Sequence, residues 1–144
     1  YLGKGAFKEI KIVQRRIQLL TVIFLVIMFH GAILYPEALV KMINPKAEYL
    51  EGSSEILRFI AGSILIYGLT SVYYQTINGS GNTKFTFYIE FVAVCVYLFF
   101  AYLFIKVLHW DIYWIWSVEY LYFGTMGILS IGYLRFFNWQ KKKI

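Results

Sequence analysis

The chain contains 144 residues, of which 60% are hydrophobic and 15% are charged, and its formal net charge is +6 at pH 7. Soluble domains are roughly 45–50% apolar and about 25% charged, and a chain of this length buries only about two-thirds of the surface that its unfolded form exposes. The excess apolar surface therefore excludes an ordinary soluble domain as well as a disordered chain, and it predicts an integral membrane protein.

Four apolar stretches predict transmembrane helices. A helix needs about 20 mainly apolar residues to cross the hydrocarbon layer, because that layer is about 30 Å thick and each residue adds roughly 1.5 Å. In chain order, the predicted spans cover residues 19–35, 59–77, 85–105 and 112–134. Between the first two spans, Pro36 favours the start of a short amphipathic helix that Pro45 terminates. The predicted fold class is therefore an all-α integral membrane protein with four transmembrane helices.

The positive charges predict the side of the membrane on which each end of the chain lies. Ten of the 14 Lys and Arg residues lie before the first span, in the link after the second span and after the fourth span. Cytoplasmic segments carry such an excess, so both ends are expected in the cytoplasm, and the bacterial inner membrane is the expected location. Because these charges flank apolar spans, the lipid bilayer and not nucleic acid is the expected partner.

The segment before the first span has two interpretations. Its basic residues are interspersed with Ile10, Val13 and Ile17 at helical spacing. This pattern is typical of a helix that lies in the membrane interface, and it suits a cytoplasmic extension of the first span equally well.

Glu90 is an ionisable residue inside the third predicted span, where such a group is costly unless it is paired or hydrated. At 100° per residue, it shares one helical face with small and polar side chains, namely Thr86, Ala93, Tyr97 and Ala101. This face predicts contact with other helices or with a water-filled cleft. Glu90 is therefore a candidate site for a coupling ion or for the charge of a solute, with Gln75 and Tyr97 as polar neighbours. The alternative is a structural carboxylate that reaches the head groups or accepts a hydrogen bond from Gln75 or Asn78.

Glu119 and His30 are the other two candidate residues inside the predicted spans. Counting residues places Glu119 about 10 Å below the outer boundary and His30 about 17 Å above the inner one, so the two lie at similar depth. A pair between them could couple protonation to the movement of a solute. The alternatives are an ion pair of Glu119 with Arg58 and a His30 that donates to a backbone carbonyl. Glu90 and Glu119 differ in depth by about 12 Å, so they are not expected to share a proton.

The link at residues 78–84 contains two glycines, but it does not match a phosphate-binding loop, which needs four residues between its glycines and a lysine directly after the second. The link predicts a tight turn, with Asn82 or Thr83 capping the third span. The single Cys95 excludes an intramolecular disulfide, and the sequence shows neither metal-ligand spacing nor a nucleophile and base pair. An enzyme, a metal site and a bound cofactor are therefore not predicted.

Four segments together resemble those of a known family. They are the glycine turn at residues 78–83, the opening segment at residues 2–10, the connection at residues 43–50 and the basic end at residues 136–144. The turn is similar to the sequence RG(A/S)G(D/N)T and the opening segment to LGxGxxxxA, both of which occur in the multidrug and toxic compound extrusion (MATE) family. The connection resembles the extracytoplasmic connection of that family, and the basic end resembles its C-terminal tail.

The resemblance implies that the chain supplies the last four of twelve helices in a two-lobe transporter, so the N-terminal helices of the same protein are expected partners. MATE transporters export small cationic or amphipathic solutes, drugs among them, in exchange for H⁺ or Na⁺, and no other cofactor is expected. At the position where some members carry a carboxylate in the second of these helices, this chain has Tyr67. The resemblance therefore assigns no role to Glu90 or Glu119.

Two alternatives to an ion-coupled exporter stay open. One is a flippase of the same superfamily that carries lipid-linked sugars, for which a basic cleft is expected. The other is a complete four-helix protein that assembles into an oligomer and serves as an accessory subunit. The start of the chain at Tyr1, within a family motif, favours a piece of a longer transporter over this second alternative.

Overall fold

A computed structural model describes residues 4–46, 48, 50–137 and 139, and every secondary-structure element in this part of the chain is helical. The all-α prediction is therefore confirmed for these residues. The elements, in chain order, are α1 (Phe7–Leu34), α2 (Pro36–Ile43), α3 (Leu50–Gly79), α4 (Thr83–Tyr102), the π-helical turn η3 (Leu103–Val107), α5 (Ile112–Ile115) and α6 (Val118–Phe136).

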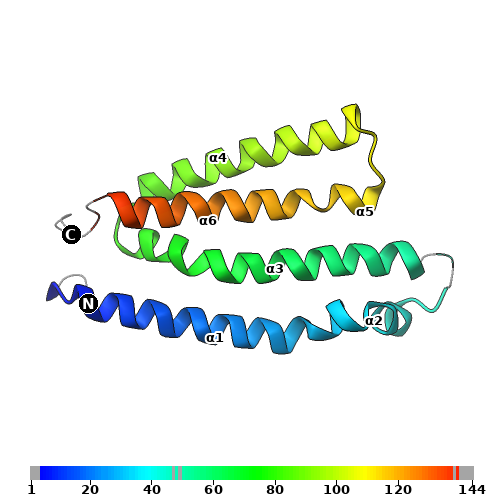
Figure 1. Cartoon of the computed structure of the whole chain (residues 1–144), viewed down its shortest axis with the longest axis horizontal. Helices are drawn as coiled ribbons and strands as arrows, with labels where there is room; N and C mark the ends of the chain where they lie inside the picture. The colour runs from blue at the N-terminus through cyan, green and yellow to red at the C-terminus, as the bar shows by residue number, and fades with distance from the viewer. Residues whose placement is uncertain (1–3, 47, 49, 138, 140–144) are drawn as a thin grey trace.

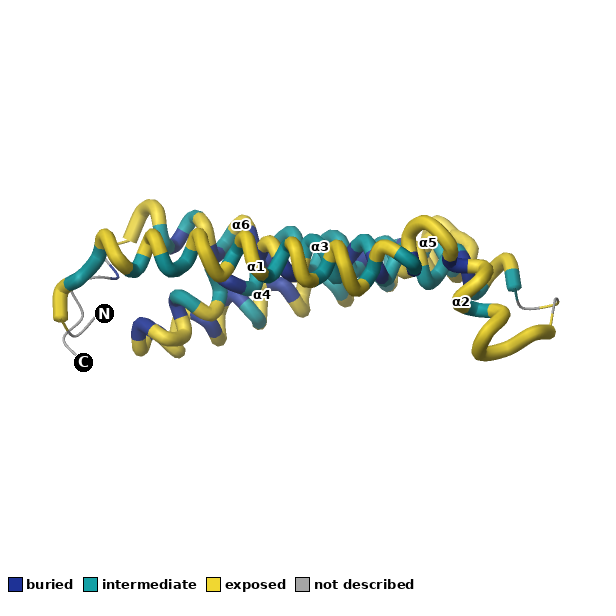
Figure 2. The backbone as a smooth tube through the Cα atoms, turned by 90° about the horizontal axis from the view of Figure 1, so that it is seen from below, coloured by how far each residue is buried: buried dark blue, intermediate teal, exposed yellow. Residues whose placement is uncertain are grey.

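The four longest of the described helices lie side by side with roughly parallel axes, in the order α4, α6, α3, α1 (Figure 1). α3 packs against α1 and α6, and α6 also packs against α4. Seen at right angles to this view, α1, α3 and α6 share one layer, and one end of α4 inclines out of it (Figure 2). A layer one helix thick has two broad faces, which explains why large apolar side chains such as Phe24, Phe87 and Phe91 are exposed.

Three helices in the described part of the chain are long and apolar enough to cross a membrane, by length and composition. They are α1, α3, and α4 continued by η3. These helices correspond to the first three predicted spans, at residues 19–35, 59–77 and 85–105. The prediction of membrane-spanning helices is therefore confirmed for three of the four segments.

The fourth predicted span, residues 112–134, is not one continuous helix. A turn separates α5 from α6, because the N–H groups of Ser117 and Glu119 bond to carbonyls three residues earlier, at 3.0 and 3.2 Å, in place of the four-residue step of an α-helix. α6 has 19 residues, but it includes Glu119, Arg135 and several Tyr, Gly and Ser residues, which lower its hydropathy. A crossing of the membrane by α6 stays a prediction.

α1 decides between the two interpretations of the N-terminal segment. The helix runs without a break from Phe7 to Leu34, so the basic residues belong to the same helix as the first span. The interpretation as an extension is therefore confirmed. α2 follows with Pro36 in its first turn, as predicted, and it is seen end-on beside α3 in Figure 1.

The predicted tight turn between α3 and α4 is confirmed. Gly81 has a φ of +77°, a left-handed conformation that glycine adopts at little cost. The N–H of Ser80 bonds to the Thr76 carbonyl at 3.1 Å, and the N–H of Asn82 bonds to the Ile77 carbonyl at 3.4 Å. Asn82 occupies the N-cap position of α4, one of the two predicted positions, but its side-chain amide donates to Ser80 Oγ at 2.8 Å and makes no cap bond to α4.

A small residue brings α3 and α6 close together. Gly127 of α6 is buried against Thr70 of α3, and a Cβ atom added to Gly127 would lie 2.9 Å from Thr70 Cβ. Helices in membranes associate through such close approach, because lipid tails are as apolar as the helix surface and provide no hydrophobic drive. Beside this contact lies a core of buried side chains, comprising Ile77, Ile89, Ala93, Met126, Tyr133 and Trp139.

Candidate functional site

Glu90 of α4 faces α6, as its small and polar helical face predicts. Its half-buried carboxylate accepts a hydrogen bond through Oε1 from the hydroxyl of Tyr122 on α6. By contrast, the hydrogen bonds that Arg58, Asn82 and Tyr113 donate to other side chains join residues two or three positions apart. The bond from Tyr122 therefore differs from these local bonds, because it ties two long helices together.

Tyr74 of α3 lies beside this carboxylate as well, and Thr86 of α4 lies beside Tyr74. The Tyr74 hydroxyl interacts with the side chains of both Glu90 and Thr86. Thr86 is buried one turn before Glu90, and its hydroxyl donates to the Thr83 carbonyl at 2.8 Å. Three helices therefore meet at one carboxylate, and we call Tyr74, Thr86, Glu90 and Tyr122 the Glu90 cluster.

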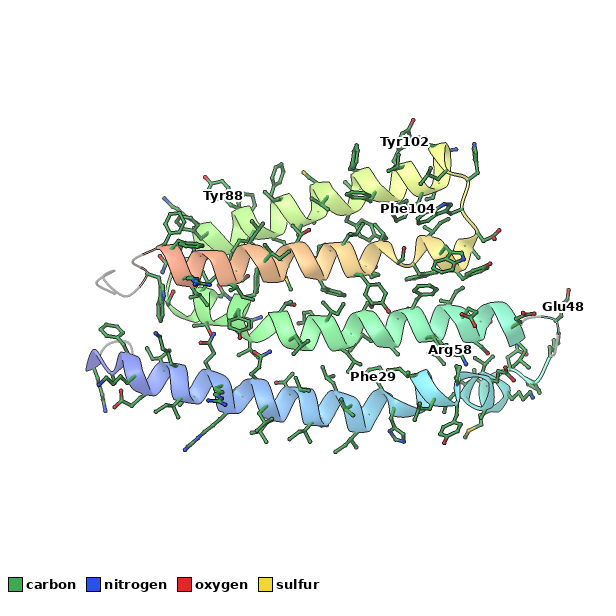
Figure 3. The ribbon with its side chains drawn as sticks, in the orientation of Figure 1. Phe29, Glu48, Arg58, Tyr88, Tyr102 and Phe104 are labelled. Atoms are coloured by element: carbon green, nitrogen blue, oxygen red, sulfur yellow. The ribbon has the colours of Figure 1, made fainter. Side chains whose placement is uncertain are left out.

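The position of the cluster follows from the two faces of α4. Thr86 and Glu90 are four residues apart and so lie on one face of the helix. Tyr88 and Tyr102 project away from the bundle on another face, with 61% and 64% of their surface exposed (Figure 3). The polar groups thus point toward neighbouring helices, while exposed aromatic rings occupy the outer face, where lipid tails would solvate them.

Of the two predicted polar neighbours, Tyr97 lies beside the cluster and Gln75 lies elsewhere. The Tyr97 ring meets the Tyr122 ring edge-on, with centroids 6.0 Å apart. Gln75 is exposed and lines a cavity of about 320 Å³ between α1 and α3. Because consecutive helical residues point about 100° apart, Tyr74 reaches Glu90 while Gln75 does not.

Glu119 and His30 lie on helices that α3 separates (Figure 1). Glu119 is half-buried in the first turn of α6. His30 is exposed on α1, where its Nδ1 donates to the Ile27 carbonyl at 2.5 Å. His30 and Glu119 therefore do not form the pair that their similar depth allowed, and the alternative, a bond from His30 to a backbone carbonyl, is confirmed.

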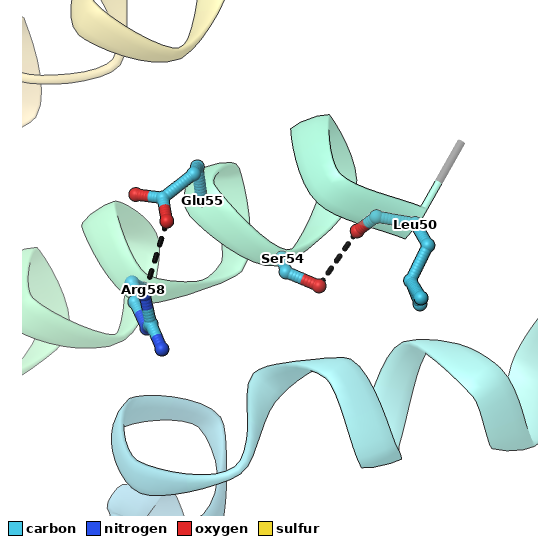
Figure 4. A network of polar contacts seen from close by, with 4 residues as sticks. All are labelled: Leu50, Ser54, Glu55 and Arg58. Atoms are coloured by element: carbon cyan, nitrogen blue, oxygen red, sulfur yellow. Dashed lines mark hydrogen bonds and ion pairs between the residues drawn. The ribbon is translucent and has the colours of Figure 1, made fainter. Parts of the chain in front are cut away.

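The alternative ion pair between Glu119 and Arg58 does not form either. Arg58 pairs with Glu55 of the same helix, with 3.0 Å between Nη1 and Oε1 (Figure 4). In the same region of α3, Ser54 donates to the Leu50 carbonyl at 2.6 Å, so these polar groups bond within their own helix. Glu119 makes no hydrogen bond or ion pair through its side chain within the described residues.

The Glu90 cluster offers one carboxylate and three hydroxyl groups. An ionised carboxylate only accepts hydrogen bonds, whereas a protonated one also donates, and a hydroxyl group can serve as donor or acceptor. The hydroxyls can therefore satisfy both forms of Glu90. In the described part of the chain, no group of three or more His, Cys, Asp or Glu side chains could hold a metal ion. The carboxylate and the hydroxyl groups offer oxygen atoms, which are the ligands that hard cations prefer.

Comparison with known proteins now places the chain in a family. A sequence model of the MatE family matches residues 1–103, which include α1 to α4 and the first residue of η3. The chain belongs to the MatE family. Its members are membrane transporters and not enzymes in general, and the chain is accordingly an integral membrane protein of the MATE superfamily. No curated protein and no solved structure matches the chain.

Within the MatE chain, sequence reasoning missed Tyr74 and Tyr122. Glu90 lies inside the matched region, whereas Tyr122 lies beyond it. One signal for Tyr122 is its place near the middle of the predicted range 112–134, because tyrosines of membrane helices are enriched near the two interfaces. A tyrosine at that depth needs a hydrogen-bond partner, and Glu90 provides it.

Proposed function

We propose that this MatE-family chain forms part of an ion-coupled exporter, in which the Glu90 cluster binds the coupling H⁺ or Na⁺ or the positive charge of the solute. The observation that carries the proposal is the half-buried Glu90 carboxylate, which receives a hydroxyl from α6 and interacts with a second from α3. Carboxylates at membrane depth are costly and mark ion or substrate pathways in transporters. Glu119 is the second candidate, because it is half-buried and its side chain makes no hydrogen bond or ion pair among the described residues.

Ion binding at Glu90 would act on the packing of three helices. The ionised carboxylate accepts the hydrogen bond from Tyr122, and a bound proton or cation neutralises its charge. Because hydrogen bonds to a charged group are stronger than neutral ones, ion binding weakens one tie between α4 and α6. A transporter needs a site at which ion binding favours one of two helix arrangements. The bond from Tyr122 to Glu90 meets this need, because its strength depends on whether the ion is bound.

The surroundings of Glu90 suit a small cationic or amphipathic solute. Tyr122, which donates to the carboxylate, packs against two further aromatic rings: its ring centroid lies 6.0 Å from that of Tyr97 and 5.1 Å from that of Phe123. Aromatic faces attract cations, and their bodies accept apolar groups. In this proposal, the N-terminal helices of the same protein supply the rest of the cavity in a two-lobe, twelve-helix arrangement, with both chain ends in the cytoplasm of a bacterium.

The test compares Glu90→Gln with Glu119→Gln in the full-length protein. Each change removes one half-buried carboxylate at nearly constant side-chain size. The measurement is ion-gradient-driven efflux of an amphipathic cationic dye from vesicles, together with the abundance of the protein in the same membranes. We expect Glu90→Gln to abolish efflux at normal abundance and Glu119→Gln to retain most of it. Full efflux by Glu90→Gln would remove Glu90 from the mechanism.

A further inference from the structure

The described charges are distributed unequally between the two ends of the bundle. Figure 1 places the start of α1, the turn between α3 and α4, and the end of α6 at one end. The described basic residues at this end are Lys4, Lys8, Lys11, Arg15, Arg16, Lys84 and Arg135, and the described acidic residue is Glu9. At the opposite end, Lys41, Lys46, Arg58 and Lys106 accompany Glu37, Glu48, Glu51, Glu55, Asp111 and Glu119. One end is therefore strongly positive, while the other carries slightly more negative than positive charge.

Three of the basic residues form a stripe on α1. Lys8, Lys11 and Arg15 are three and four residues apart, so their side chains fall within about 60° of one another around the helix axis. All three are exposed, and none of them forms an ion pair within the described residues. They are spread over about 10 Å along the axis. We call Lys8, Lys11 and Arg15 the basic stripe.

The basic stripe lies between the side of α1 that contacts α3 and an exposed apolar surface. The face of α1 that contacts α3 includes Gln18, whose Nε2 donates to the Leu69 carbonyl at 2.6 Å, and Leu25, which packs against Gly68. On the other side of the stripe, Ile12 and Leu19 are 52% and 61% exposed. The exposed surface at this level of α1 thus combines cations with aliphatic side chains.

The length of α1 places the stripe at the level of lipid head groups. The helix has 28 residues, which corresponds to about 42 Å, whereas the hydrocarbon layer is about 30 Å thick and the whole bilayer about 40–45 Å. About 30 Å of helix counted back from Leu34 reaches Arg15, so Lys11 lies about 6 Å and Lys8 about 10 Å beyond the hydrocarbon layer. Lys and Arg side chains at such a position reach toward the phosphates.

We propose that the basic stripe binds the phosphate of an anionic phospholipid, with Ile12 and Leu19 against its acyl chains. The charge selects an anion, and the adjoining apolar side chains select one that carries hydrocarbon. Juxtamembrane cations of this kind favour anionic lipid by about 1 kcal/mol each, which corresponds to roughly fivefold in affinity per cation. The proposal is independent of the role of Glu90.

Native mass spectrometry of the full-length protein tests this proposal. The protein is offered equal amounts of phosphatidylglycerol and phosphatidylcholine in detergent, and the ratio of bound lipids is measured. We expect the wild type to prefer phosphatidylglycerol and to lose this preference as salt rises. The variant Lys8→Gln/Lys11→Gln/Arg15→Gln should lower the preference at least tenfold, since the three contributions multiply to roughly a hundredfold.

A matched control removes the same charge elsewhere. Lys41→Gln/Lys46→Gln/Lys106→Gln, at the opposite end, should keep the preference of the wild type. If the triple variant fails to fold, Lys8→Gln alone takes its place, because it changes one exposed residue in the first turn of α1. This single change should lower the preference roughly fivefold. A wild type without preference, or equal losses in both triple variants, would overturn the proposal. Displacement of the lipid by excess inorganic phosphate would show a plain anion site and would overturn it too.

Discussion

Replacing Gly127 by alanine tests whether close packing of α3 and α6 supports the Glu90 cluster. The added methyl group would collide with the Thr70 methyl group and would lie 2.9 Å from Thr70 Cβ and 3.9 Å from Thr70 Cα. Thr70 is β-branched and buried, and its hydroxyl donates to the Tyr67 carbonyl at 3.1 Å, so its side chain has little freedom to turn away. Overpacking of this kind lowers the free energy of unfolding by about 1–3 kcal/mol.

Denaturant titration of the purified full-length protein in detergent measures this change. Gly124→Ala and Gly132→Ala are matched controls on the same helix, because a Cβ atom at either position meets no other atom within 4 Å. These controls should be neutral or more stable by up to about 1 kcal/mol, since alanine has the higher helix propensity. The reasoning is refuted if Gly127→Ala is as stable as they are.

A double variant locates the collision. Thr70→Ala removes the methyl group that Gly127→Ala would strike, so the loss of stability in the double variant should be smaller than the sum of the two single losses. Additive losses would show that the cost of Gly127→Ala arises elsewhere. Because Tyr122 lies on the same helix as Gly127, we also expect Gly127→Ala to reduce transport.

Three further predictions concern single side chains. Tyr122→Phe should reduce efflux at normal protein abundance, because Glu90 loses its hydrogen-bond donor. The control Tyr102→Phe, on the outer face of α4, should leave efflux unchanged. Equal efflux by the two variants would contradict the role of Tyr122 as the donor to Glu90. Gly81→Ala should lower the free energy of unfolding, measured by thermal unfolding, by about 1 kcal/mol or more, because the φ of Gly81 is +77°. Gly79→Ala should not lower it. Equal effects of the two changes would argue against a left-handed conformation at Gly81. Arg58→Gln should lower stability by less than about 1 kcal/mol, since its ion pair is exposed, and a loss of several kcal/mol would show that Arg58 has a buried partner.

The sequence predicted the helices better than their ends. Hydropathy located three spans, because a run of apolar residues long enough to cross the hydrocarbon layer is rare outside membrane helices. It did not decide whether the helix begins near Leu19 or at Phe7, because a basic amphipathic segment has the same pattern in an interfacial helix and in the extension of a span. It also missed the turn at Ser117, where neither glycine nor proline interrupts the apolar pattern.

The candidate site was predicted only in part. The helical face of Glu90 predicted contact with another helix, and the structure shows that contact. Counting residues along each predicted span did not identify Tyr122 as the partner of Glu90, because the count puts Glu90 about 8 Å and Tyr122 about 18 Å from the inner boundary. Such a count treats the helices as upright and level, whereas α4 inclines relative to its neighbours (Figure 2). The same assumption allowed a pair of His30 and Glu119, since depth does not reveal that α3 lies between their helices.

The central claim is that Glu90 binds the coupling cation and that Tyr122 donates to it. Infrared difference spectroscopy of the full-length protein in lipid vesicles, recorded as H⁺ or Na⁺ is added, reports the bonding of carboxyl groups directly. We predict a carboxyl signal that is lost in Glu90→Gln, shifted in frequency in Tyr122→Phe and unchanged in Glu119→Gln. A signal that persists in Glu90→Gln, or that keeps its frequency in Tyr122→Phe, would contradict the claim.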